Sequence, residues 1–152
     1  MNYIQRGKEM KVPFKEVVLD GGAVIALLLS GEESELFKNI LNENIVSMTT
    51  SLAIIETEYI LCRKIGKEKA FEKVDNLIDS NYVNITPLEH FRRDISILKC
   101  NNTISVPDCA TIALATINKI PALFAKKEEE LKKPIENNAF KIKIFFLEDL
   151  TN

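Results

Sequence analysis

The stretch EVVLDGG, residues 16–22, decides the fold of this chain. Its central run VVL is β-branched and apolar, which predicts a short strand buried on both faces. Asp20 ends the strand, and the two glycines that follow break it before an apolar helix expected over residues 23–30. A buried strand that leads directly into a helix is the beginning of a βαβ unit, from which parallel sheets are built.

The same alternation continues along the chain. Further strands are expected over residues 45–48, 82–86, 121–125 and 141–147, and helices over residues 32–41, 51–65, 67–80, 87–101, 106–119 and 127–133. Strands separated by helices predict right-handed crossovers and an α/β fold whose parallel sheet is covered on both faces. In such sheets ligands bind outside the carboxyl ends of the strands, where Asp20 stands.

Length and composition indicate one soluble domain. The chain has 152 residues, 46% hydrophobic and 28% charged. Its net charge of −2 argues against tight non-specific binding to duplex nucleic acid, although an enzyme that contacts few phosphates is not excluded. Three cysteines without a CxxC spacing indicate a reduced, cytoplasmic protein, and the single histidine excludes a His-rich zinc site. No segment approaches the ~20 apolar residues of a membrane span.

Three carboxylates stand in apolar surroundings. Asp20 ends the first strand, Glu56 lies in the helix pattern SLAIIE, and Asp108 opens the helix SVPDCA. An ionised carboxylate among apolar side chains is costly unless something pairs with it, and no Lys or Arg is adjacent to any of the three. Hard divalent cations prefer carboxylate oxygens. The pattern therefore predicts an acidic cluster gathered around Mg²⁺ or Mn²⁺.

Each carboxylate also has a structural explanation that the sequence leaves open. Asp20 before two glycines is typical of an Asx-turn or a helix cap. Asp108 stands three residues after Ser105, with a proline between them, which is the spacing of a capping box. Glu56 also suits an exposed position at the edge of its apolar stripe.

Three motifs, taken in order, resemble those of PIN domains, most closely the VapC-like toxins of prokaryotic toxin–antitoxin pairs. They are VVLDGGAVIALL at 17–28, SLAIIE at 51–56 followed by RKIG at 63–66, and ISVPDCATIALA at 104–115. The resemblance implies a PIN-like three-layer α/β/α sandwich with a central, mainly parallel sheet. It places this PIN-like domain over residues 15–152. The mixed polar composition at the start of the chain predicts a flexible N-terminal extension over residues 1–14.

The resemblance also implies a function, that of a metal-dependent endoribonuclease and toxin. Asp20, Glu56 and Asp108 would act as catalytic residues that hold one or two Mg²⁺ or Mn²⁺ ions and hydrolyse RNA phosphodiesters. Similar proteins form homodimers and are silenced by a cognate antitoxin that enters the cleft. Four basic residues near the motifs are candidate phosphate contacts in substrate binding: Arg63, Lys64, Lys126 and Lys127.

The chain departs from the family pattern after the late strand. Many relatives carry Thr or Ser there, then any residue, then Asp, whereas this chain reads FAKKEEEL over residues 124–131. Counting forward from the strand places Lys127 at the acidic position, and counting back from Leu131 places Glu128 there as a fourth metal ligand. The acidic run also suits the start of a helix, because it complements the helix dipole.

A second departure is that Gly21 and Gly22 stand where relatives commonly have a hydroxyl residue just after the first Asp. Losing the residues that support metal ligands typically costs 10–100-fold in metal affinity or activity. The alternative hypothesis is therefore a catalytically faded PIN-like domain that acts as an RNA- or protein-interaction module.

Overall fold

The VVL run forms β1 (Glu16–Leu19), the central strand of the sheet in the part of the chain that the structure describes, residues 12–30 and 34–150. The structure is a computed structural model. Each neighbouring pair of these strands is parallel, which confirms the predicted sheet. The order across the sheet is β3 (Val83–Thr86), β2 (Val46–Thr50), β1, β4 (Ala122–Phe124) and β5 (Ile144–Phe146).

Helices connect the strands close to where the sequence predicts them. They are α1 (Gly21–Ser30) and α2 (Glu35–Leu41) before β2; α3 (Ser51–Ile65) and α4 (Lys67–Ser80) before β3; the 3₁₀ turn η2 (Leu88–Phe91), α5 (Arg92–Asn101) and α6 (Val106–Asn118) before β4; α7 (Glu129–Glu136) before β5; and α8 (Leu147–Leu150) after it. Helix α7 extends three residues past its predicted end, through Pro134.

Alternating side chains of β1 divide the core into the two halves of a three-layer sandwich, as predicted. Val17 and Leu19 are fully buried in one half, together with apolar residues of α1, α2, α3 and α4. Val18 is fully buried in the other, with residues of α5, α6 and α7. Phe14, before β1, is also buried, and its ring lies 5.4 Å from that of Phe145. Residues 1–11 of the expected extension lie outside the described residues, and the domain boundary at residue 15 stays a prediction.

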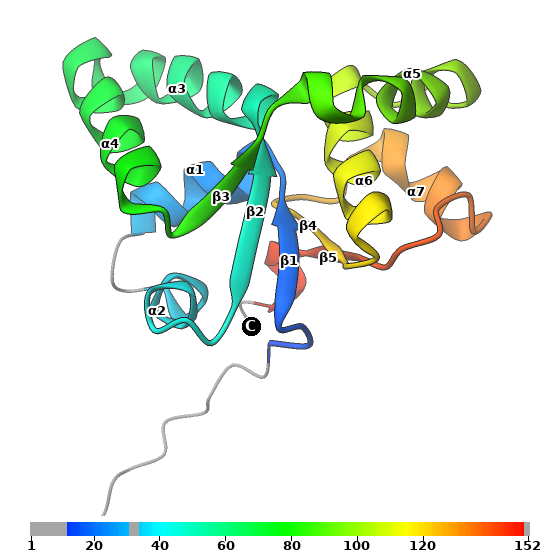
Figure 1. Ribbon diagram of the computed structural model, residues 1–152, viewed down its shortest axis with the longest axis horizontal. Coiled ribbons are helices and arrows are strands. Elements are labelled where there is room, and N and C mark those ends of the chain that lie inside the picture. Colours follow the sequence, from blue (N-terminus) through cyan, green and yellow to red (C-terminus); the bar gives the residue numbers. More distant parts are fainter. Residues whose placement is uncertain (1–11, 31–33, 151–152) are drawn as a thin grey trace, which may run out of the picture.

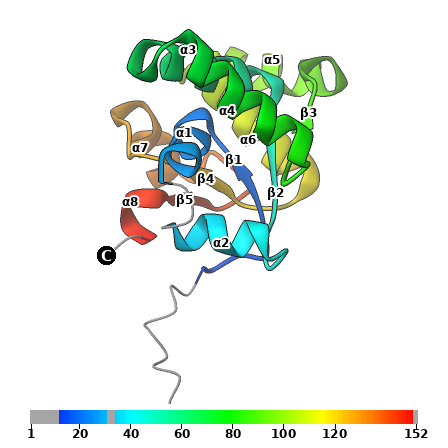
Figure 2. The same ribbon diagram turned by 90° about the vertical axis from the view of Figure 1, so that its left-hand side faces the viewer.

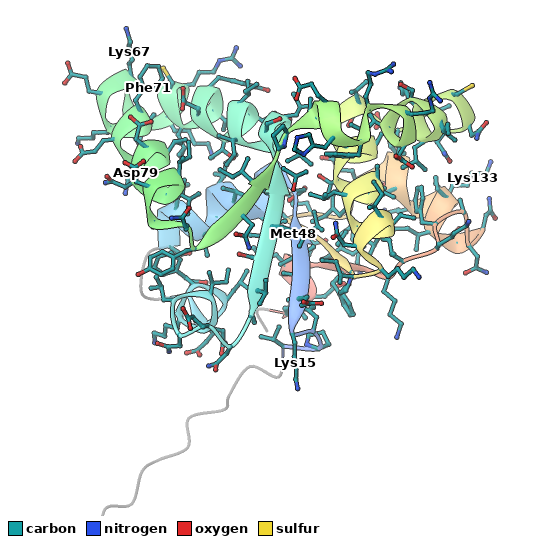
Figure 3. All side chains as sticks on the ribbon, in the orientation of Figure 1. Lys15, Met48, Lys67, Phe71, Asp79 and Lys133 are labelled. Carbon is teal, nitrogen blue, oxygen red and sulfur yellow. The ribbon has the colours of Figure 1, made fainter. Side chains whose placement is uncertain are left out.

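Two helical arms extend beyond the carboxyl end of the sheet. Figure 1 shows α3 and α4 on one side of the ends of β1 and β2, and α5 with α6 on the other. Figure 2 shows α3 and α4 above the sheet and α2 at its opposite end. In Figure 3, Lys67 and Phe71 mark the outer end of one arm, whereas Lys15 lies at the far end of β1. The helices that follow β1 and β2, α1 and α3, therefore begin at this end of the sheet.

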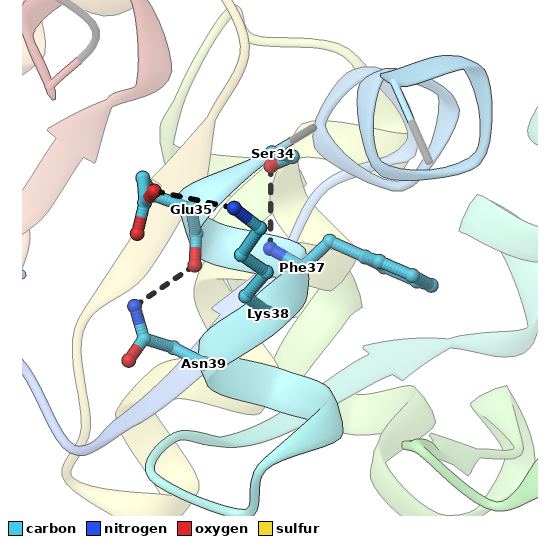
Figure 4. A network of polar contacts seen from close by, with 5 residues as sticks. All are labelled: Ser34, Glu35, Phe37, Lys38 and Asn39. Carbon is cyan, nitrogen blue, oxygen red and sulfur yellow. Dashed lines mark hydrogen bonds and ion pairs between the residues drawn. The ribbon is translucent and has the colours of Figure 1, made fainter. Parts of the chain in front are cut away.

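Local capping explains why several helices begin where they do. The Ser34 hydroxyl accepts a hydrogen bond of 3.2 Å from the Phe37 amide and starts α2, as Figure 4 shows. The Thr50 hydroxyl accepts one of 3.0 Å from Ala53 and starts α3 at the end of β2. Such caps satisfy amide groups that have no partner within the helix.

The glycines after β1 differ from the sequence expectation, because they belong to α1 rather than preceding it. The reason is a close approach between this helix and the end of β4. A Cβ atom at Gly22 would lie 2.8 Å from the Cβ of Ala125, a distance that real Cβ atoms essentially never show. A Cβ at Gly21 would meet only ordinary contacts, the nearest 3.4 Å away at Glu56 Oε1. Gly22 therefore lets α1 start directly against β4.

We expect Gly22→Ala to lower the free energy of unfolding by about 1–3 kcal/mol, the usual cost of overpacking, because α1 must shift away from β4. Urea denaturation would measure this change. Gly21→Ala is the matched control from the same turn and should be neutral or stabilising, since Ala favours helix over Gly by up to ~1 kcal/mol. Equal stability of the two variants would contradict the close approach.

Candidate metal centre

Four acidic residues from distant parts of the sequence line one cleft. The cleft has a volume of about 420 Å³ and lies among α1, α3, the start of α6 and the loop after β4. Its lining includes all the acids that the sequence singles out: Asp20, Glu56, Asp108 and Glu128. A larger hollow, near Lys15 and Phe145 at the opposite edge of the sheet, holds none of them.

Asp20 is both a helix cap and part of the cleft. Its Oδ1 accepts a hydrogen bond of 2.7 Å from the Ala23 amide, so the Asx interpretation and the functional one are compatible. Burial raises the pKa of Asp20 from 3.8 to about 7. The backbone amides of Ala23 and Ala125 act to lower this pKa, and the Asp108 and Glu128 carboxylates act to raise it.

Asp108 is buried at the start of α6, but its carboxylate is not the helix cap. The Ser105 hydroxyl has that role, since it accepts a hydrogen bond of 3.3 Å from the Asp108 amide. Only 8% of Asp108 is exposed, and its Oδ2 has no hydrogen-bond partner among the described residues. Burial and then Glu128 raise the pKa of Asp108 to about 6; Ser105 lowers it, while Glu56 and Glu130 add to the rise.

Glu56 reaches the cleft from the second turn of α3 and is half-buried. Burial, followed by the Glu128 carboxylate, raises its pKa. The backbone of Gly21 faces this side chain, because an added Cβ there would lie 3.4 Å from Glu56 Oε1. A side chain at that position would therefore sit beside the Glu56 carboxylate.

The loop after β4 turns Glu128 and Lys127 in different directions. Glu128 lines the cleft, and although it directly precedes α7, its side chain makes no capping hydrogen bond. Lys127 contacts α8 instead. Its Nζ lies 2.9 Å from Asp149 Oδ2, and its backbone amide donates a hydrogen bond of 3.1 Å to Glu148 Oε1. Of the two positions that the sequence offers for the fourth acid, the one counted back from Leu131, Glu128, therefore lies in the cleft.

The four basic candidates also separate into two pairs. Lys64 and Lys126 line the cleft together with the acids. Arg63 is outside the lining, and its guanidinium lies 5.2 Å from the centre of the Tyr59 ring. Lys127 is occupied by α8, as described above. Two of the four basic candidates, Lys64 and Lys126, are therefore part of the cleft lining.

Glu130 joins the acids, although sequence reasoning missed it. One carboxylate oxygen from each of Asp108, Glu128 and Glu130 lies within 4.8 Å of the other two. The signal that could have revealed Glu130 is the run EEE, in which the first and third residues lie near Asp108. Clustered carboxylates and the unpartnered Asp108 Oδ2 fit a divalent cation such as Mg²⁺ or Mn²⁺, because hard cations bind oxygen ligands.

The chain belongs to the PIN domain family, whose family model matches residues 17–134. This match confirms the family resemblance of the three motifs. No curated protein sequence matches the chain. In the described residues, no helix is long and apolar enough to cross a membrane.

Solved structures of two VapBC complexes contain chains of similar fold. One is DNA-bound VapBC from Salmonella typhimurium, with a TM-score of 0.58 and 14% identity, covering 86% of this chain and 97% of that chain. The other is VapBC2 from Rickettsia felis bound to a DNA fragment from its promoter, with a TM-score of 0.57 and 13% identity, covering 85% and 96%. At these identities the similarity concerns the fold.

The raised pKa of Asp20 predicts how stability depends on pH in the metal-free protein. The folded state keeps a proton on Asp20 up to about pH 7, whereas the unfolded chain loses it near pH 3.8. The stabilising contribution is therefore complete below pH 3.8 and is lost as pH rises to about 7. We expect the free energy of unfolding in EDTA to fall by roughly 2 kcal/mol between about pH 5 and pH 8.

Asp20→Asn should weaken this pH dependence while keeping the oxygen that accepts the Ala23 hydrogen bond. Urea denaturation at several pH values would measure the slope. Asp75→Asn, a change on the exposed side of α4, is the control that keeps the wild-type slope. An unchanged slope in Asp20→Asn would contradict the burial of this carboxylate.

The orientation of Lys127 predicts that restoring the acid of the family pattern at this position adds no metal ligand. Lys127→Asp should leave Mn²⁺ affinity unchanged, because residue 127 faces α8. It should also cost about 0.5–1 kcal/mol of stability, since it places a carboxylate beside Glu148 and Asp149. Isothermal titration with Mn²⁺ and urea denaturation test both statements. Tighter Mn²⁺ binding would show that residue 127 reaches the cleft.

Proposed function

We propose that the protein is a metal-dependent endoribonuclease that hydrolyses RNA phosphodiesters with Mg²⁺ or Mn²⁺. The observation that carries this proposal is the cleft lined by Asp20, Glu56, Asp108 and Glu128, in which the buried Oδ2 of Asp108 has no hydrogen-bond partner among the described residues. Membership of the PIN domain family supports it. Carboxylates that repel one another and are partly desolvated favour a bound cation, which relieves both costs.

The acids would hold the ion and the lysines would hold the substrate. When bound, a divalent ion supplies an activated water and neutralises charge on the phosphate. Asp20 and Asp108, with their raised pKa values, would lose protons as the ion binds. Lys64 and Lys126 would contact the phosphate as point charges at the cleft.

The small number of basic groups in the cleft suits a substrate held by few phosphates. Two lysines line it, and the net charge of the chain is −2. Binding that neutralises few phosphates depends only weakly on salt. We therefore propose an RNA segment whose scissile phosphodiester enters the cleft, rather than an extended duplex.

We also propose that the protein is a cytoplasmic toxin that forms a homodimer and is silenced by a cognate antitoxin. The fold shared with chains of two VapBC complexes supports an antitoxin partner. Apolar side chains exposed near the cleft provide a surface that a partner can cover. They are Leu29 on α1, which lines the cleft, and Ile55 and Tyr59 on α3.

Incubating the protein with single-stranded and structured RNA should give cleavage with Mg²⁺ or Mn²⁺ and none with EDTA. Asp20→Asn should reduce the rate by more than about 100-fold, because it removes a charge that acts directly on the ion. Asp75→Asn on α4 is the exposed control and should cleave like wild type. The measurement is the rate at which labelled RNA is converted to shorter products.

Two other outcomes would separate the alternatives. RNA binding without cleavage would favour the catalytically faded interaction module. Cleavage that persists in EDTA or in Asp20→Asn would contradict the proposed site.

A further inference from the structure

The acids of the cleft divide into two groups. Asp108, Glu128 and Glu130 place one oxygen each within 4.8 Å of one another. Within residues 12–30 and 34–150, no other trio of Asp, Glu, His or Cys ligand atoms meets this distance. Asp20 and Glu56 thus line the same cleft without belonging to the close trio. The trio is therefore the most compact set of acidic ligand atoms among the described residues.

Asp108 supplies a second, independent indication of a ligand. The residue is 92% buried, and its Oδ2 has no hydrogen-bond partner among the described residues. A buried carboxylate oxygen without a partner is costly, and native structures normally satisfy such atoms. Because Asp108 is also a member of the trio, a cation placed among the three carboxylates would satisfy it.

The charge around the cleft also suits more than one ion. Four carboxylates line it, and that of Glu130 lies beside two of them, Asp108 and Glu128, whereas two lysines belong to the lining. With all of these groups ionised, the formal charge is −3. One divalent cation would leave −1, which repels a phosphodiester, and two would give +1, which attracts it.

We propose that Asp108, Glu128 and Glu130 form a cation site of their own, on the α7 side of the cleft, in which Glu130 is a direct ligand. Asp20 and Glu56, which line the cleft outside this trio, serve the other ion. This cation site rests on the proposed function in one respect, because the site and the proposed ribonuclease both require divalent ions in this cleft. It adds a ligand that the family pattern does not indicate.

Glu129 provides a matched control for Glu130. The two residues are adjacent, both are exposed, and both belong to the first turn of α7. The Glu129 carboxylate points elsewhere, because its Oε1 lies 2.8 Å from Lys132 Nζ and its side chain is 88% exposed. Glu130→Gln and Glu129→Gln therefore remove the same charge from the same helix turn, and only the first removes a proposed ligand.

The test measures how many Mn²⁺ ions the full chain binds and how tightly. The protein is first treated with EDTA, and the EDTA is then removed. Binding is measured by isothermal titration calorimetry and by electron paramagnetic resonance of the free Mn²⁺. Wild type should bind two ions. Glu130→Gln should lose one ion or weaken its binding by about 10-fold or more, the effect expected for a lost metal contact. Glu129→Gln should bind like wild type. Thermal melting in EDTA checks that each variant is folded.

Two results would overturn the inference. One is Mn²⁺ binding by Glu130→Gln that equals that of Glu129→Gln in both stoichiometry and affinity. The other is a wild type that binds one ion or none. RNA cleavage is measured separately, so the two proposals can fail independently. A protein that does not cleave RNA but loses Mn²⁺ when Glu130 is changed would retain the cation site and refute the ribonuclease.

Discussion

The parallel pairing of β1 with both β2 and β4 is the constraint on which the site depends. Parallel strands end at the same edge of a sheet, so the segments that follow β1, β2 and β4 all begin there. Asp20 follows β1, Glu56 lies in the helix that follows β2, and Glu128 belongs to the loop that follows β4. Asp108 reaches the same place because α6 packs on the sheet with its first turn at this edge.

The same geometry gives the cleft an electrostatic cost. The Asp20 and Asp108 carboxylates are removed from water, and both have raised pKa values for that reason. A core built only for stability would place apolar side chains here. Keeping acids in these positions lowers the stability of the metal-free fold. An ion that binds only the folded chain would offset this loss, because such binding stabilises the folded state.

Most of the fold and part of the candidate site could be predicted from local patterns. The strand VVL and the Ser105 cap are encoded by neighbouring residues, and the structure has both of them. The direction of Lys127 and the position of Glu130 were not predictable in this way. Both depend on contacts with distant segments, α8 and the start of α6, that no local pattern describes. The start of α1 depended likewise on its approach to Ala125.

The contact between Lys127 and α8 has a consequence for protein synthesis. The loop that carries Glu128 is held by a hydrogen bond to a residue 21 positions later in the chain, Glu148, and by the ion pair with Asp149. When the ribosome has translated this loop, it has not yet synthesised α8, which carries both partners. Once α8 has been synthesised, it must still pass through the exit tunnel before it can contact the loop. The nascent polypeptide therefore emerges with its acidic loop untethered, and the loop gains these two contacts only after α8 has left the tunnel.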